Sequence, residues 1–136
     1  MDTAIAARAC PATLHIPLPA DAQAPLRARQ AVGRTLALRG DCCPAAVADD
    51  IVLIVSELVT NAVLHARGPY ALTLSLEAGR ARVEVGDGSA GLSGHRPAED
   101  RPEPGGRGLK IVRALGADLF TRPSGRGKQV IAVLTW

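Results

Sequence analysis

The stretch AAVADDIVLIVSELVTNAVLHA, residues 45–66, carries the strongest helix signal in the chain. Its apolar side chains recur every three to four positions and form one wide stripe, so we predict a helix over this range. Pro44 comes just before it, where a helix tolerates proline, and Gly68 and Pro69 end it. The residues of the stripe are Ile51, Ile54, Val55, Leu58, Val59, Ala62 and Val63.

Two polar residues lie beside this stripe. Glu57 and Asn61 are four positions apart, so their side chains project from the same face of the helix. A carboxylate can position or deprotonate a nucleophile. An amide oxygen is a hard ligand that suits Mg²⁺ bound together with phosphates. A solvated helix face is the alternative explanation, and His65 continues the same line without a catalytic role that the sequence supplies.

Hydrophobic patterning predicts the other elements on both sides of this helix. In chain order they are a strand over 13–18, a helix over 22–38 capped by Asp21, strands over 70–76 and 80–85, a helix over 109–115, and strands over 118–122 and 128–134. Consecutive hairpins predict a mixed, mostly antiparallel sheet with the helices on one face. We therefore expect an α+β fold, a two-layer α/β sandwich. It would be one domain, residues 12–136, after a flexible tail, residues 1–11.

A carboxylate follows the strand predicted over 80–85. Asp87 precedes the small residues Gly88, Ser89, Ala90 and Gly91. A strand that ends this way can bring a carboxylate to the mouth of a pocket and let the backbone approach a flat ligand. The carboxylate can accept a hydrogen bond from the exocyclic amine of adenine. A plain Asp-Gly turn is the alternative explanation.

Glycines open the helix predicted over 109–115, in the sequence GGRGL of residues 105–109. Such an opening exposes backbone N–H groups at a helix N-terminus, where phosphate binds well. It matches neither a Rossmann fingerprint nor a Walker A loop, and a flexible loop with a helix cap is the alternative. Residues 86–108 are rich in Gly, Pro and Ser, and loops of that length are usually functional lids or disordered.

Composition excludes several classes of protein. Aromatic residues make up only 2% of the chain and no run of like charges accompanies the net charge of +3, so we expect no direct nucleic-acid binding. No segment resembles a signal peptide or approaches the roughly 18 apolar residues of a membrane span. The three cysteines form a poor disulfide framework, so we expect reduced thiols in a cytoplasmic protein.

Taken in order, the motifs closely resemble those of the GHKL ATPases, which have the Bergerat ATP-binding fold and are also called histidine kinase-like ATPases. ELVTNAVLHA resembles their N box, VEVGDGSAG their first glycine box and GGRGLKIV their second. The resemblance covers residues 22–136, and the short form is most similar to the bacterial anti-sigma-factor serine/threonine kinases. It implies binding of ATP with Mg²⁺.

The resemblance also implies a role for each matched position. Glu57 would be the general base or a water-orienting carboxylate, Asn61 would coordinate Mg²⁺, and Asp87 would bind the adenine amino group. Residues 92–104 would form a lid over ATP. Further nucleotide contacts would come from Gly91, Gly106, Arg107, Gly108, Leu109 and, beside Gly127, Lys128. Ser89 replaces the first glycine of the usual DxGxG pattern, which alters how the backbone meets adenine.

The function implied is that of a bacterial transcription regulator. It would phosphorylate a small antagonist protein, sequester a sigma factor and form a homodimer. One alternative is a catalytically weak, nucleotide-gated protein-interaction module with a partner other than a sigma factor. A detached histidine-kinase catalytic domain ranks lower, because the sequence has no pattern for a phosphoacceptor helix hairpin.

Overall fold

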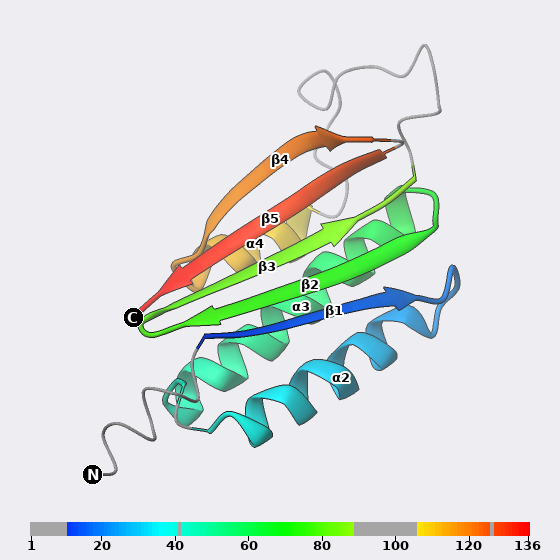
Figure 1. Ribbon diagram of the computed structural model, residues 1–136. Coiled ribbons are helices and arrows are strands. Elements are labelled where there is room, and N and C mark those ends of the chain that lie inside the picture. The colour runs from blue at the N-terminus through cyan, green and yellow to red at the C-terminus, as the bar shows by residue number, and fades with distance from the viewer. Residues whose placement is uncertain (1–10, 41, 89–105, 126) are drawn as a thin grey trace, which may run out of the picture.

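The computed structural model describes residues 11–40, 42–88, 106–125 and 127–136 (Figure 1). The elements, in chain order, are β1 (Ala12–Leu18), α2 (Ala24–Leu38), α3 (Ala45–His65), β2 (Tyr70–Glu77), β3 (Arg80–Gly86), α4 (Gly106–Ala114), β4 (Asp118–Ser124) and β5 (Gly127–Thr135). Every predicted helix and strand is present. The largest difference in bounds is at α4, which begins at Gly106 instead of residue 109. The glycines therefore form the first turn of this helix.

The strands form one sheet with the order β1-β2-β3-β5-β4, and all neighbouring strands are antiparallel. The helices lie together on one face of this sheet (Figure 1), where α2 contacts β1, α3 contacts β3 and β5, and α4 contacts β4. This arrangement confirms the predicted α+β fold with its helices on one face. In the described residues the sheet has no parallel pair, because β3 and β4, which the crossover through α4 connects, lie on either side of β5 and are not neighbours.

The core between the two layers is aliphatic. Residues alternate along β2 so that Leu72, Leu74 and Leu76 are fully buried against the helices, whereas the residues between them are only partly buried. The stripe of α3 supplies the opposite side of the core, with Ile51 and Ile54 completely covered. Burial of each such side chain stabilises the fold by about 1.5–3 kcal/mol. This packing fixes the rotation of α3 and hence the direction of its polar side chains.

Two local expectations are wrong. Asp21 does not cap α2, because the N-cap residue is Gln23. The Oδ1 atom of Asp21 instead accepts the backbone N–H of Gln23 at 2.7 Å, in a turn before the helix. Pro25, in the first turn, moves the start of the helix beyond the reach of Asp21. The expectation of reduced thiols fails at Cys42, which is disulfide-bonded, whereas Cys43 is free.

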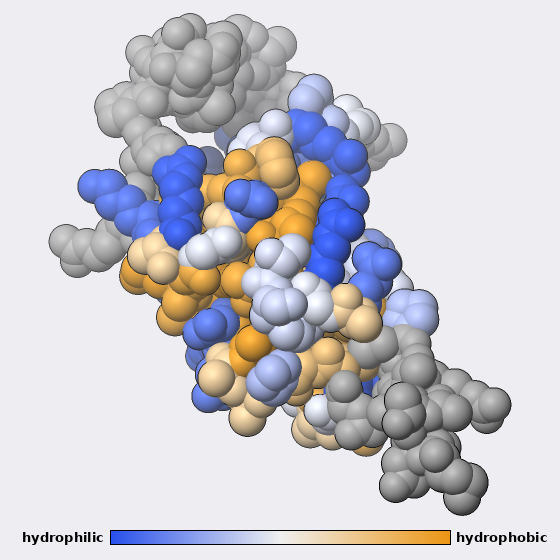
Figure 2. All heavy atoms as spheres, turned by 90° about the vertical axis from the view of Figure 1, so that its left-hand side faces the viewer, coloured by the Kyte–Doolittle hydropathy of each residue, from blue (hydrophilic) through white to orange (hydrophobic). Residues whose placement is uncertain are grey.

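Figure 2 views the molecule from the left-hand side of Figure 1. Apolar residues occupy the middle of that side, and hydrophilic residues lie on both flanks. This distribution agrees with two amphipathic layers that enclose their apolar faces. Among the helices that the structure describes, none combines the length and the apolar character needed to cross a membrane.

Candidate functional site

The carboxylate of Glu57 lies against the first turn of α4. A Cβ atom added at Gly108 would be 3.0 Å from Glu57 Oε1, a distance tighter than most side chains tolerate. The helices α3 and α4 are packed together, and the missing side chain at Gly108 leaves room for the carboxylate between them. Two motifs that are distant in sequence are therefore neighbours in the fold.

Asn61 lies about one helical turn further along α3. Its Oδ1 atom is buried and has no hydrogen-bond partner among the described residues. A buried amide oxygen without a partner costs free energy, roughly 1–3 kcal/mol, and such an atom calls for an explanation. A hard cation would satisfy it, since amide oxygens are among the ligands of Mg²⁺.

The donor set around Asn61 fits a cation that brings other ligands with it. Within the described ranges, no group of three or more His, Cys, Asp or Glu side chains could hold a metal ion without help. Mg²⁺ usually keeps several waters and binds through one or two protein ligands together with phosphates. The residues present therefore fit a magnesium–nucleotide complex better than a metal ion held by protein alone.

Asp87 directly follows β3, and its side chain is only 2% exposed. Both carboxylate oxygens face Lys128 at the start of β5: Lys128 Nζ donates to Oδ2 at 2.9 Å, and the backbone N–H of Lys128 donates to Oδ1 at 3.3 Å. The backbone N–H of Asp87 in turn donates to the carbonyl of Lys128 at 3.0 Å. The β3–β5 pairing thus holds this carboxylate in place.

Close backbone packing fixes the segment around Asp87. A Cβ atom at Gly127 would overlap the backbone carbonyl oxygen of Asp87, so position 127 requires glycine. On the other side, the N–H of Gly88 donates to the carbonyl of Arg67 at 2.7 Å, which joins the end of β3 to the turn after α3. Asp87 is therefore held between the start of β5 and the C-terminal end of α3.

Tyr70 reinforces the same junction. Its hydroxyl donates to the carbonyl of Ala66 at 2.8 Å, at the C-cap of α3. Burial raises the pKa of Tyr70, and the negative charge of Asp87 raises it further. The sequence indicated Tyr70 only as the start of a strand. The position of Tyr70 just after Gly68-Pro69 is a sequence signal that could have indicated its contact with the end of α3. The proximity of Tyr70 to Asp87, however, depends on the order of the strands.

Glu57, Asn61 and Asp87 therefore follow one another in the direction of the α3 axis, although Asp87 itself comes after β3. Glu57 faces α4, Asn61 follows, and Asp87 lies beyond the helix end at Ala66. Glu57 and Ala66 are about 14 Å apart along the helix axis, at 1.5 Å per residue. One edge of the molecule thus has a carboxylate beside a helix N-terminus, an unsatisfied amide oxygen and a buried carboxylate.

The remaining predicted contacts divide into two groups. Gly106 and Arg107 belong to the first turn of α4, and Leu109 is partly buried against the core, so any nucleotide contact of Leu109 would use its backbone. Gly91, Ser89 and the predicted lid over 92–104 lie outside the described residues, as does the predicted tail apart from residue 11. His65 is exposed at the end of α3.

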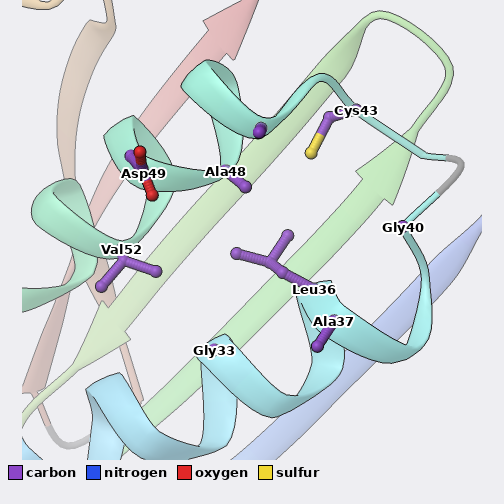
Figure 3. Close-up of a pocket in the computed structure, with 9 residues that line it drawn as sticks. Gly33, Leu36, Ala37, Gly40, Cys43, Ala48, Asp49 and Val52 are labelled. Atoms are coloured by element: carbon purple, nitrogen blue, oxygen red, sulfur yellow. The ribbon is translucent and has the colours of Figure 1, made fainter.

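A separate hollow of about 330 Å³ opens between α2 and α3. Figure 3 shows Leu36 and Ala37 of α2 on one side, with Cys43, Ala48 and Val52 on the other. Burial raises the pKa of the Cys43 thiol. None of the predicted site residues lines this hollow, so it is distinct from the edge that carries Glu57, Asn61 and Asp87.

The chain is similar to known proteins of one family. Residues 18–134 match the model of the family described as histidine kinase-like ATPase domain, and the chain belongs to that family. It is an ATP-binding domain of the histidine kinase-like type. The match spans all the described candidate residues from Glu57 to Lys128. No curated protein matches the chain.

Two solved structures are similar to the chain. One is the histidine kinase domain of the blue-light activated histidine kinase from Erythrobacter litoralis EL346, with 26% identity, a TM-score of 0.50 and coverage of 79% of this chain. The other is that blue-light activated histidine kinase itself, with 31% identity over 68% of this chain and a TM-score of 0.49. This chain spans 60% of the first structure and 31% of the second.

Proposed function

We propose that this protein is a serine/threonine protein kinase that acts as an anti-sigma factor in bacteria. It would use ATP with Mg²⁺ to phosphorylate a small antagonist protein, and it would bind a sigma factor as a protein partner. The family supplies ATP binding, and the intact pair Glu57 and Asn61 supports catalysis. The resemblance of ELVTNAV to the short N box of these kinases supports the choice of substrate.

The observation that carries the proposal is the unsatisfied oxygen of Asn61. A buried acceptor without a partner is costly in a protein that binds nothing there. The same atom becomes a useful ligand when a phosphate-bound cation is present. Asn61 would therefore hold Mg²⁺, which supplies charge neutralisation at the phosphates when bound.

The order of groups along α3 supports one direction for the bound nucleotide. The base would lie at the Asp87 end, where the buried carboxylate can accept from the amine of adenine. The phosphates would lie toward Asn61 and the first turn of α4, because the positive end of a helix favours phosphate. The γ-phosphate would then lie near Glu57, which faces that turn at Gly108.

Glu57 would act on the hydroxyl of the substrate protein. In phosphoryl transfer the hydroxyl oxygen forms a bond to the γ-phosphorus, the bond from that phosphorus to the bridging oxygen breaks, and ADP leaves. The hydroxyl proton would pass to the Glu57 carboxylate, which must lie within hydrogen-bond reach of the hydroxyl. The absence of a side chain at Gly108 keeps the carboxylate free to take up that position.

Protein partners would dock on the helical layer. Arg27 and Arg34 are exposed on the flank of α2 beside β1, and Arg29 is exposed on the flank beside α3, where it donates to Ser56 Oγ at 3.1 Å. These positive charges suit an acidic partner. The same helix is also available to a second copy of the chain, in agreement with the homodimer that the resemblance implies.

The test of ATP binding is calorimetric titration with and without Mg²⁺. We expect the wild type to bind ATP in a Mg²⁺-dependent manner and Asn61→Ala to lose that dependence. Binding that is unaffected by both Mg²⁺ and Asn61→Ala would refute the role of Asn61. The absence of ATP binding under all conditions would refute the kinase.

A second candidate function is a nucleotide-gated interaction module with little catalysis and a partner other than a sigma factor. The observation that favours it is the ion pair between Asp87 and Lys128. In this ion pair the Lys128 ammonium group already binds the carboxylate that would accept a hydrogen bond from adenine. Glu57→Gln separates the two functions. Transfer of the γ-phosphate of ATP to candidate antagonist proteins should stop in the kinase, whereas ATP-dependent partner binding should survive in the module.

A further inference from the structure

The acceptor that the base needs is held by a cation of the protein itself. Lys128 Nζ is 2.9 Å from Asp87 Oδ2, and the Asp87 side chain is 2% exposed, compared with 30% for that of Lys128. An ammonium group and the amine of a purine are both N–H donors that bind a carboxylate oxygen. Lys128 therefore occupies the position of the donor that an incoming base would bring.

The geometry leaves little room for both donors. Only 2% of the Asp87 side chain is accessible, and the ammonium group of Lys128 is one of the groups that cover it. The second oxygen, Oδ1, accepts from the backbone N–H of Lys128. An amine that approaches Oδ2 from the direction now taken by Lys128 Nζ therefore requires the Lys128 side chain to move away.

The Lys128 side chain can move without disturbing the fold. Its backbone is anchored independently, because its carbonyl accepts the N–H of Asp87 and Lys128 pairs with Pro123 in the β4–β5 ladder. The long, flexible stem allows the ammonium group to swing toward solvent. An exchange of donors on Asp87 thus requires a rotamer change and no movement of a strand.

We propose that Lys128 determines base discrimination at this site, by making the amine of a nucleotide compete with its own ammonium group for Asp87. The inference rests on the proposed nucleotide site. In the wild type, the gain from the amine–carboxylate contact is offset by the loss of the ion pair. The protein therefore discriminates weakly between a purine with the exocyclic amine and one without it, and removal of the ammonium group restores discrimination.

The test compares ATP with purine riboside triphosphate, which has no exocyclic amine, in wild type and Lys128→Met. The measured quantity is the ratio of the two dissociation constants. Both ligands carry the same triphosphate, so any attraction between Lys128 and phosphate cancels in this ratio. We expect a ratio within about threefold of one in the wild type, and a preference for ATP of about tenfold or more in Lys128→Met, as for a hydrogen bond to a charged group.

Two further variants serve as controls. Lys128→Arg keeps a cation beside Asp87 and should retain the small ratio of the wild type. Lys128→Gln replaces the cation by a neutral donor and should give an intermediate ratio. It also covers the case in which Lys128→Met fails to fold because the buried Asp87 carboxylate loses its ion pair, which thermal unfolding would reveal.

The outcomes separate this inference from the function on which it rests. Equal ratios in wild type, Lys128→Met and Lys128→Gln, with ATP bound by all, would overturn the role of Lys128 and leave the nucleotide site intact. Weaker ATP binding in Lys128→Met without a larger ratio would also overturn it, because Lys128 would then assist binding without sensing the amine. A failure of the wild type and of every variant to bind either triphosphate would refute the nucleotide site itself.

Discussion

Gly108 and Glu57 are so close that even one methyl group at Gly108 would lie 3.0 Å from the Glu57 carboxylate oxygen Oε1. The contact joins the first turn of α4 to the middle of α3. It explains why glycine is needed at this position without any unusual backbone angle, since Gly108 is helical. The carboxylate, as the far end of a flexible side chain, is the group that would move.

The substitution Gly108→Ala should therefore impair chemistry more than folding. We expect the rate of ATP turnover to fall by about tenfold or more, because a misplaced catalytic group is costly. The free energy of unfolding should change by less than about 1 kcal/mol, since alanine favours the helix and the carboxylate can shift. Turnover assays and urea denaturation measure the two effects.

The matched control is Gly33→Ala in α2, where an added Cβ meets no atom within 4 Å. It makes the same chemical change in a helix away from Glu57 and should leave turnover unaltered. A Gly108→Ala variant with the turnover of the wild type would show that the position of the Glu57 carboxylate does not matter to the reaction.

Asn61→Leu should weaken ATP binding without lowering the stability of the fold. The substitution removes a buried acceptor that has no partner among the described residues, so the free energy of unfolding should stay equal or rise by about 1 kcal/mol. Mg²⁺-dependent ATP affinity should fall, since the ligand oxygen is gone. Thermal unfolding and calorimetry check both. Asn61→Asp keeps a hard oxygen ligand and should retain Mg²⁺-dependent binding; a loss of stability in Asn61→Leu would mean that Oδ1 is satisfied after all.

The junction of β3 and β5 should be intolerant of a side chain at Gly127. A Cβ atom there would overlap the backbone oxygen of Asp87, which cannot move aside as a side chain can. We expect Gly127→Ala to lower the free energy of unfolding by roughly 3 kcal/mol, measured by urea denaturation. Gly40→Ala is the control, because its Cβ would make only an ordinary contact at 3.8 Å. Equal stability of the two variants would contradict the packing at Asp87.

The elements of this fold could be predicted from sequence because each has a local signal. The stripe of α3 and the alternation of β2 depend only on residues a few positions apart, and both are present as expected. Glu57 and Asn61 were predicted on one face for the same reason. The start of α2 was misjudged, because Pro25 and Asp21 each suit a helix N-terminus and the sequence does not decide between them.

The contacts that define the site could not be predicted in this way. Lys128 meets Asp87 because β3 pairs with β5 and not with β4, and hydrophobic patterns contain no information on strand order. Tyr70 reaches Ala66 through the turn after α3 for a similar reason. The motifs supplied the residue types, but the partners of these residues depend on long-range pairing.

Tyr70 is the only tyrosine of the chain, so its ionisation can be followed by phenolate absorbance without interference from another tyrosine. Its pKa is raised above 10.0 in the folded state, first by burial and then by the charge of Asp87. The folded protein thus holds this proton more tightly than the unfolded chain. The contribution to stability is fully present below pH 10.0 and is lost as the pH rises toward the folded pKa.

We therefore expect the absorbance midpoint of the folded protein to lie above 10.0, and Asp87→Asn to lower it without bringing it back to that value, since burial is the larger cause. Tyr70→Phe should remove the tyrosine-dependent loss of stability in alkali. At neutral pH the same variant should lose about 1 kcal/mol, because the hydrogen bond to the Ala66 carbonyl is gone. A midpoint in Asp87→Asn equal to that of the wild type would show that the Asp87 carboxylate does not act on Tyr70, and the arrangement at the base end of the site would have to be revised.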